Sequence, residues 1–524
     1  MQTKVKCASV RGIEAIMVDV EVDVGRGLPT TEIIGLGDKT VREASGRVKS
    51  AIRSSGFDYP MSRITVNLAP ASVPKKGGHF DLAIAVGILV CCGEAFSRRL
   101  KDTGFIGELS LDGRLCASKS VLPMVAEMKK KGVRYVVLPR ENIHEASLID
   151  GIGIIAADSL SETVDILNGK NTAKQEKKCG GAAGGSALAA GPEYPNCPNI
   201  NGESMEHDNH ADTIDFADIK GQEYAKRAVE VAVSGGHAIL MIGSPGTGKT
   251  MIAERIPSLF PKMTHEEVVE LTGIYSTAGL LSKDMPIVSE RPFRRPGRNI
   301  SSQGMLGSGY PPMPGEVTLA HKGILFIDEL CEFDRNTIES LRVPLDLHYV
   351  VLTKRGETFR YPADFFLVAA SNPCKCGYYG DPRHECTCTP GEIAAYRSKM
   401  SGPILDRIDI HLTMAAPGID ELESGRSMTS DDMREHIKAA RAIQEKRFGR
   451  KGRLNSDMND REASEYASGG GGESVFREAY ERLALNPRSL SKAKKVARTI
   501  ADLNGHEKVS ANDAAEALQY RERI

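Results

Sequence analysis

The feature that most constrains this chain is a glycine-rich segment, Gly243-Ser244-Pro245-Gly246-Thr247-Gly248-Lys249-Thr250, directly after the apolar run 238–242. A buried strand that turns into a glycine-rich loop and then a helix directs several backbone N–H groups at one point, which suits a nucleotide's phosphates. In this pattern the lysine contacts the β- and γ-phosphates and the final hydroxyl ligates Mg²⁺. The segment predicts an α/β nucleotide-binding fold with ATP and Mg²⁺ as cofactors, and a plain glycine turn is the alternative.

Length and composition indicate a globular protein of more than one domain. Its 524 residues exceed what one core usually holds, and 41% hydrophobic with 26% charged residues exclude a fibre or a disordered chain. The net charge of −1 means that any nucleic-acid surface must be a local concentration of charge. No apolar run reaches the roughly 18 residues of a membrane span and no secretory signal is evident. With 11 mostly scattered cysteines, we expect a cytoplasmic protein without membrane contact.

Shifts in composition divide the chain into four parts. Residues 1–168 alternate β-rich and helical runs, as a mixed α/β domain does. Residues 169–213 are rich in small and polar residues without apolar periodicity, which predicts a flexible linker. Residues 214–418 hold the phosphate loop and the motifs that follow it, and residues 419–524 are mostly helical, which predicts a lid domain.

The first domain contains a strand, a Pro/Gly-rich loop and an apolar helix over 66–82 that resemble the Lon-protease-like domain. In that domain a nucleophilic serine follows a similar Pro-Lys-x-Gly loop, and His79 stands at its position here. Because histidine cannot form the alkoxide of a Ser–Lys dyad, the resemblance implies a non-proteolytic domain, with a protein partner that the sequence does not identify.

Two apolar strands after the phosphate loop end in residues suited to hydrolysis. Run 322–327 precedes Asp328, which can hold Mg²⁺, and Glu329, which can deprotonate the attacking water. Such acids are often purely structural, but their place about 80 residues after a phosphate loop favours an ATPase. Run 365–370 leads to Asn372, where ATPases of the AAA+ class carry a polar residue that senses the γ-phosphate.

Two arginines are candidates to contact phosphates. Arg407 lies between Asp406 and Asp409, so it is either locked by one of these acids or serves as an arginine finger for a neighbouring subunit's nucleotide. Arg488 precedes a predicted lid helix, from which it either faces solvent or reaches the phosphates.

A cysteine cluster follows Asn372. Four thiolates on a glycine-rich loop, in two C-x-C pairs, could hold one structural Zn²⁺ without an open position for catalysis. A reduced loop and a redox pair are the alternatives. The four residues are Cys374, Cys376, Cys386 and Cys388.

Seven runs of the sequence are shared with one known family: 291–296, 314–323, 372–377, 402–411 and 496–503, with 67–82 and 516–521. Together they resemble the magnesium-chelatase-like AAA+ family known as YifB/ComM, and the resemblance covers nearly the whole chain outside the linker. It implies a hexameric ring with ATP bound between subunits, Arg407 as a finger in trans and Arg488 as a second sensor. Relatives often carry two histidines where this chain has Gly297 and Arg298.

The resemblance also implies DNA, single-stranded or branched, as the substrate. In relatives, a loop near 283–300 and a hairpin near 350–358 face the pore of the ring. A ring repeats such charges around one axis, so a near-neutral chain can line a basic channel, although a solvated charge run is the alternative. Arg482 to Arg498, without an acid between them, predict a second basic patch. The candidate DNA contacts are Arg294, Arg295, Lys354 and Arg355.

The expected function is therefore an ATP-hydrolysing AAA+ motor on DNA, a helicase of branch migration in recombination and natural transformation. The alternative is a magnesium-chelatase-like ATPase that remodels a protein partner, although the chain has no D-x-S-x-S metal-adhesion motif. An ATP-dependent protease is a third reading, and the missing serine argues against it.

Overall fold

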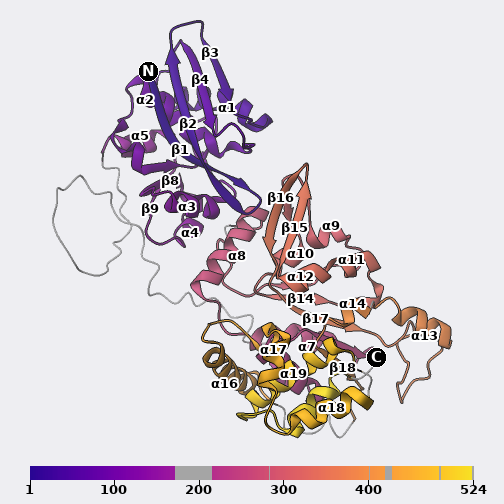
Figure 1. Ribbon diagram of the computed structural model, residues 1–524. Helices are drawn as coiled ribbons and strands as arrows, with labels where there is room; N and C mark the ends of the chain where they lie inside the picture. Colours follow the sequence, from indigo (N-terminus) through magenta and orange to yellow (C-terminus); the bar gives the residue numbers. More distant parts are fainter. Residues whose placement is uncertain (171–214, 283, 401, 419–427, 483–484, 522–524) are drawn as a thin grey trace, which may run out of the picture. The chain divides into compact units, whose positions relative to one another are not determined.

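A computed structural model of the chain describes residues 1–170, 215–282, 284–400, 402–418, 428–482 and 485–521 (Figure 1). The chain divides into two compact units, Met1–Met205 with Thr264–Ser289 and Glu206–Met263 with Glu290–Ile524. Most of the predicted linker 169–213 lies outside the described residues.

The first unit is built on a seven-stranded mixed sheet of order β3-β4-β2-β1-β5-β8-β9. The long antiparallel pair β1–β2 forms its centre, and β5, β8 and β9 extend the β1 side in parallel. The strands are β1 (Gln2–Arg11), β2 (Glu14–Gly25), β3 (Thr30–Ile34), β4 (Arg63–Ala69), β5 (Thr103–Phe105), β8 (Tyr135–Pro139) and β9 (Gly153–Ala157), with a separate pair β6 (Glu108–Leu109) and β7 (Leu115–Cys116).

The central helix of this unit is α2 (Asp81–Cys92), which is buried from Asp81 to Cys91. A helix that is apolar on every side must be covered all round, and α2 contacts the sheet strands β1 and β2 and the helices α1 and α5. Its one buried acid, Asp81, forms a bidentate ion pair with Arg47. The other helices are α1 (Lys39–Ser54), α3 (Val121–Lys130), α4 (Ile143–Ala146) and α5 (Leu160–Leu167).

A helix from the middle of the chain, α8 (His265–Ala278), belongs to this first unit. Thr264 and Glu267 form a capping box at its start, and Gly279 ends it with a positive φ of 68°. It contacts α3, and the Ser276 hydroxyl donates to the buried Glu145 carboxylate at 2.7 Å. From its sequence position this segment is expected inside the domain 214–418, but it leaves that domain and packs with the N-terminal one.

The second unit holds a five-stranded parallel sheet of order β11-β14-β17-β10-β18. Its buried strands are short and uniformly apolar, as expected for a parallel sheet covered on both faces. The strands are β10 (Ile239–Gly243), β11 (Phe293–Arg294), β14 (Ile324–Ile327), β17 (Phe366–Ser371) and β18 (Ile410–Met414). The helices before the lid are α6 (Glu223–Gly235), α7 (Lys249–Arg255), α9 (Ser302–Leu306), α10 (Glu316–Leu319), α11 (Arg335–Ser340), α12 (Arg342–Leu347), α13 (Pro390–Arg397) and α14 (Gly402–Leu405).

Two antiparallel hairpins interrupt the succession of strands and helices in this unit. Figure 1 shows the longer one, β15 (Tyr349–Lys354) and β16 (Glu357–Pro362), as a two-stranded projection. The shorter one joins β12 (Gly307–Gly309) and β13 (Pro312–Pro314).

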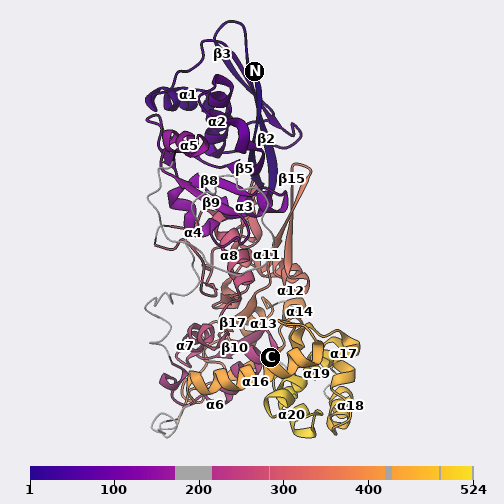
Figure 2. The same ribbon diagram turned by 90° about the vertical axis from the view of Figure 1, so that its left-hand side faces the viewer.

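The C-terminal helices of the second unit are drawn in orange to yellow in Figure 2. Their apolar faces join the same core as the sheet, where Ile437, Val496 and Ile500 are buried together with Ile239 and Ile410. The helices are α16 (Ser430–Phe448), α17 (Asp460–Tyr466), α18 (Gly472–Arg482), α19 (Pro487–Leu503) and α20 (Ala511–Gln519).

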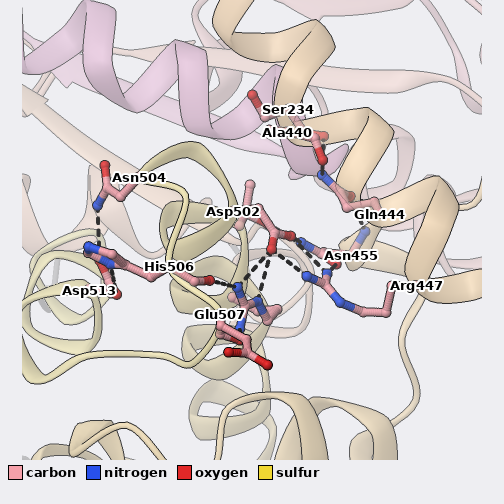
Figure 3. Close-up of polar contacts among 12 residues, drawn as sticks. Ser234, Ala440, Gln444, Arg447, Asn455, Asp502, Asn504, His506, Glu507 and Asp513 are labelled. Carbon is pink, nitrogen blue, oxygen red and sulfur yellow. Dashed lines mark hydrogen bonds and ion pairs between the residues drawn. The ribbon is translucent and has the colours of Figure 1, made fainter.

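A buried polar network fixes the lid helices to one another (Figure 3). Asp502 of α19 is fully buried and accepts hydrogen bonds from Arg447 of α16, from Arg498 of its own helix and from Asn455 at 2.9 Å. Gln444 links the network to α6, since its amide donates to the carbonyl of Ser234 at 3.0 Å. Because each member is satisfied, the network specifies the lid arrangement.

The prediction of a second basic patch between Arg482 and Arg498 is wrong for two residues, Lys492 and Arg498. Arg498 is only 3% exposed and binds Asp502, and Lys492 forms a buried ion pair with Asp409. Asp409 also contacts His237, whose other ring nitrogen contacts the Thr499 hydroxyl of α19. These cations stabilise the junction of lid and sheet and are not available to a phosphate backbone.

Candidate nucleotide-binding site

The phosphate loop lies between β10, which ends at Gly243, and α7, which begins at Lys249. Gly246 and Gly248 have positive φ values of 82° and 91°, a conformation that side chains with a Cβ rarely adopt. No heavy atom lies within 4 Å of the place where a Cβ would stand at either glycine. The loop therefore offers an open cradle of backbone N–H groups that fits a triphosphate.

The ammonium of Lys249 is buried within this cradle. Its Nζ donates to the carbonyls of Gly243 at 2.6 Å and Ser244 at 3.0 Å. Burial lowers the pKa of Lys249, and the charges of Asp328 and Glu329 oppose that shift. The lysine is thus near enough to both carboxylates to interact with them electrostatically. Thr250, one residue on, occupies the Mg²⁺-ligating position of the motif.

The register of the parallel sheet brings the predicted hydrolytic residues to the same edge. Ile242 pairs with Ser371, so the phosphate loop and Asn372 both begin at the carboxyl ends of neighbouring strands. Ile327 pairs with Ala369 on the other side of β17, which places Asp328 and Glu329 at that edge too. These residues come together because parallel strands end on the same side of a sheet.

Arginines that follow β11 hold the two acids. Arg295 forms an ion pair with Asp328 and lies 3.5 Å from a carboxylate oxygen of Glu254, and Arg298 pairs with Glu329. The segment 293–300 lines an open pocket of about 600 Å³ at this place. The sequence does not predict the contact of Arg295 with Glu254 or the ion pair of Arg298 with Glu329, because each joins residues that lie far apart in the chain.

The predicted DNA contacts Arg294 and Arg295 are both engaged with carboxylates in this structure. Arg294 makes a bidentate pair with Glu316, with both N···O distances at 2.8 Å, and Arg295 reaches the acid of the nucleotide site. Their contact with DNA stays a prediction, and it competes with these ion pairs.

Arg407 and Arg488 meet at one carboxylate, that of Asp346 in α12. Arg407 is therefore held by neither Asp406 nor Asp409. Its side chain is 11% exposed, and its buried Nε has no hydrogen-bond partner among the described residues. The sequence gives no motif around Asp346 that would have indicated this role.

Both arginines lie towards the amino edge of the sheet, away from the phosphate loop of their own chain. The N–H of Asp409, two residues after Arg407, donates to the carbonyl of Ala238 just before β10. Arg521 binds the carbonyl of Ile408 and the hydroxyl of Ser489, next to Arg488. The phosphate loop begins at the other end of β10, roughly 13 Å farther along the strand.

The hairpin β15–β16 carries Lys354 and Arg355 at its tip, as the sequence predicts. Arg355 and Gly356 form the two-residue turn with positive φ values of 52° and 78°, as in a type I′ turn. The guanidinium of Arg355 lies 4.5 Å from the ring centre of Tyr310, which joins β12 and β13. The two hairpins therefore meet at their tips.

The four predicted metal-ligand cysteines also come together. The sulfur atoms of Cys374, Cys376, Cys386 and Cys388 all lie within 4.8 Å of one another, on the loop between β17 and α13.

In the N-terminal unit, His79 occupies the position expected for the nucleophile of a Lon-type domain. Its Nε2 donates to the carbonyl of Ala8 at 3.0 Å, and burial lowers its pKa to about 4. The non-proteolytic nature of this domain stays a prediction. Among the described residues, no helix is both long and apolar enough to cross a membrane.

Comparison with known proteins extends over almost the whole chain. Residues 215–422 match the family "Magnesium chelatase, subunit ChlI", residues 20–142 match "Subunit ChlI of Mg-chelatase", and residues 427–521 match the C-terminal family of the same subunit. The family suggests ATPase activity with ATP and Mg²⁺.

Relatives of similar length give the same result. Competence protein ComM of Haemophilus influenzae is 36% identical over 518 residues, which cover 98% of this chain and 96% of that protein. YifB of Escherichia coli is 35% identical over 513 residues, which cover 97% and 95%. Lon protease 2 of Bacillus subtilis matches only 148 residues, at 30% identity. With these matches over nearly its full length, the chain belongs to the magnesium-chelatase-like AAA+ family of YifB and ComM.

Proposed function

We propose that the chain is an ATPase that assembles into a ring and moves on DNA. The observation that carries this proposal is the division of the phosphate-contacting groups between two edges of one sheet. The phosphate loop and the acids after β14 gather at the carboxyl edge, whereas Arg407 and Arg488 meet at Asp346 towards the amino edge. A neighbouring copy is then needed to bring arginines to the nucleotide, and closed rings supply such head-to-tail contacts at every interface. A hexamer is the proposed ring.

Within one chain, the phosphate loop and Lys249 bind the triphosphate, and Thr250 with Asp328 hold Mg²⁺. Glu329 takes the proton of the attacking water, and Asn372 orients that water against the γ-phosphate. Bound Mg²⁺ neutralises charge on the phosphate oxygens. For these steps the acids must exchange their present partners, Arg295 and Arg298, for metal and water.

From a neighbouring copy, Arg407 stabilises the charge that develops on the transferred phosphoryl group. Fingers of this kind accelerate hydrolysis about 10³- to 10⁵-fold. The buried Nε of Arg407 has no hydrogen-bond partner among the described residues. This supports the proposal that the arginine binds a group that its own chain does not provide. Arg488, bound to the same Asp346, acts beside it as the second sensor.

The DNA part of the proposal rests on the hairpin tips. Lys354 and Arg355 project two cations per chain from β15–β16, and the adjacent Tyr310 offers a ring for base stacking. A ring repeats this set around its axis, which provides a basic channel although the chain carries a net charge of −1. Branch migration of recombining strands, in natural transformation, is the proposed task.

A structural Zn²⁺ at the four cysteines is proposed as a second metal site, separate from the Mg²⁺ site. Four thiolates leave no open position, so this ion takes no part in hydrolysis.

The alternative is an ATPase that remodels a protein partner, as a chelatase motor does. The matches to the chelatase subunit over 20–142, 215–422 and 427–521 favour this second candidate. In that case the N-terminal unit would provide the partner surface, and nucleic acid would leave the rate of hydrolysis unchanged.

Steady-state ATP hydrolysis with and without single-stranded and forked DNA separates the two candidates. We expect several-fold stimulation in the native chain and none in Lys354→Gln/Arg355→Asn, in which Asn-Gly preserves the type I′ turn. Arg450→Asn/Lys451→Gln, which removes an exposed basic pair elsewhere, is the matched control, and Glu329→Gln is the inactive reference. An unchanged rate, together with no binding of DNA at moderate salt, would refute the DNA proposal and leave the protein partner.

A further inference from the structure

The cysteine loop has the dimensions of a tetrahedral thiolate site. The Sγ–Sγ distances are 3.3 Å for Cys374–Cys376, 3.7 Å for Cys374–Cys386 and 3.5 Å for Cys376–Cys386. Zinc–sulfur bonds of about 2.3 Å place the ligand atoms of one ion about 3.8 Å apart. All four cysteines are free thiols, so the cluster is not a pair of disulfides.

Backbone N–H groups already point at two of these sulfur atoms. The N–H of Cys376 donates to the sulfur of Cys388 at 3.4 Å, and the N–H of Tyr379 donates to that of Cys374 at 3.3 Å. Such bonds stabilise thiolate charge and orient metal ligands. The loop is therefore arranged for thiolates and not merely for four small apolar side chains.

The same loop packs against the phosphate loop through Gly377. A Cβ at this glycine would lie 2.8 Å from Cδ and 2.9 Å from Cγ of Pro245, and its φ of 89° is also one that other residues avoid. The close approach thus requires glycine directly after the second cysteine of the first pair. Pro245 and Gly246 are the two exposed residues at the turn of the phosphate loop.

A polar contact joins the two loops beside this apolar one. The Ser244 side chain is the largest cause that holds the pKa of Asp381 below its usual value, so the two side chains interact across the loops. The Asp381 carboxylate also accepts the N–H groups of Arg383 at 2.8 Å and His384 at 3.1 Å. Asp381 lies between the two cysteine pairs, so its position depends on how the loop is closed.

The far side of the loop is fixed to the next helix. Arg397 of α13 donates to the carbonyl of Pro373 at 3.2 Å and lies over the ring of Tyr379. Pro373 directly follows Asn372, so the residue that orients water and the phosphate loop are both attached to the segment that the cysteines close.

We infer that Cys374, Cys376, Cys386 and Cys388 form a structural zinc site that holds the phosphate loop in its binding shape, so that loss of the metal lowers the affinity for ATP. The inference rests on the proposed binding of ATP at 243–250. Zinc acts here through Gly377 and Asp381 on Pro245 and Ser244, and it touches neither nucleotide nor Mg²⁺.

The metal itself is tested by elemental analysis of the full chain, purified with a thiol reductant and without added metal. We expect about one zinc per chain, the complement of a four-thiolate site. Cys386→Ser/Cys388→Ser should lose it, whereas Cys92→Ser/Cys116→Ser, at two exposed cysteines of the N-terminal unit, should keep it. When Co²⁺ replaces the zinc, the native chain should show the visible absorption of a tetrahedral cobalt–thiolate site. Cys386→Ser/Cys388→Ser should not show it. A native chain without zinc would overturn the metal site.

The link to the phosphate loop is tested with a variant that keeps all four thiols. Asp381→Ala should retain zinc but bind a fluorescent ATP analogue about three- to tenfold more weakly, the effect of one lost hydrogen bond. Glu385→Ala removes an exposed acid from the same loop and should change neither quantity. Unaltered ATP affinity in zinc-loaded Asp381→Ala would overturn the link.

A third variant separates this inference from the proposed function. Lys249→Ala should lose ATP binding and keep its zinc. If Lys249→Ala binds ATP like the native chain, the assignment of the nucleotide site is wrong, whatever the zinc content.

Discussion

Arg298 forms an ion pair with Glu329, the acid that we expect to activate water. The pair joins the segment after β11 to the carboxyl end of β14, where Arg295 binds Asp328 in the same way. The nucleotide site therefore contains its own counter-ions, which must move aside before the acids can serve metal and water.

We predict that Arg298→Ala raises the basal rate of ATP hydrolysis in the absence of DNA. A partly exposed ion pair is worth up to about 1 kcal/mol, so freeing Glu329 should increase the rate about two- to fivefold. Arg298→Lys should stay near the native rate, and Arg477→Ala, at an exposed arginine of α18, is the control. A fall in the rate of Arg298→Ala would instead mean that this arginine assists hydrolysis.

Mixing two inactive variants tests whether Arg407 acts on a neighbouring copy. Arg407→Ala and Glu329→Gln should each reduce hydrolysis more than about 100-fold while ATP still binds. In randomly mixed rings, about a quarter of the interfaces then combine an intact Glu329 with an intact Arg407, and activity should return in proportion. Mixtures that stay inactive, although the subunits are shown to co-assemble, would contradict a finger in trans.

The buried network of the lid makes a prediction about stability. Asp502→Asn leaves Arg447 and Arg498 buried without their acid, which should cost about 3–5 kcal/mol of unfolding free energy. Chemical denaturation monitored by circular dichroism should show this loss, and Glu481→Gln, at an exposed acid of α18, should show none. Native stability in Asp502→Asn would mean that a neutral amide satisfies both guanidinium groups.

The N-terminal unit should lose stability in mild acid through His79. Burial lowers the pKa of this histidine to about 4 from its ordinary 6.5, so below pH 6.5 the unfolded chain binds a proton that the folded chain does not. The stabilising contribution of the neutral ring is therefore present above pH 6.5 and is lost as the pH falls towards 4.

The measurement is the thermal midpoint of the full chain as a function of pH, compared with His79→Gln, which keeps a donor for the Ala8 carbonyl. We expect the difference between the two proteins to move in favour of the variant as the pH falls from about 6.5 to about 4. Asp81, whose pKa burial raises to about 6, titrates in both proteins. Parallel pH curves would contradict the role of His79.

The sequence is sufficient to predict which residues of the candidate nucleotide site lie at one edge of the sheet, because their signals are local. The phosphate loop, Asp328, Glu329 and Asn372 each follow an apolar run, and parallel strands carry such residues to one edge whatever the rest of the fold. The hairpin with Arg355 at its tip is instead expected from the resemblance to the family, and its turn includes Gly356, whose positive φ of 78° suits a two-residue turn.

What the sequence does not reveal is the pairing of distant side chains. Asp346 binds Arg407 and Arg488 across intervals of 61 and 142 residues, and no periodic pattern connects them.

The sequence also does not predict which unit α8 joins. Its capping box identifies a helix, but nothing local tells which core the helix will join. Leu271 and Ile274 are buried within the N-terminal unit, so tertiary packing overrides the order of the chain.

This route of the chain has a consequence for the isolation of the second unit. A cut in the linker, with residues 1–168 discarded, would remove α3 and leave α8 with Leu271, Ile274 and Tyr275 bare to water, although all three are buried in the intact protein. Such a fragment would carry a helix with an exposed apolar face and would tend to aggregate, whatever its activity. A soluble fragment of the second unit also needs 264–289 replaced by a short polar bridge.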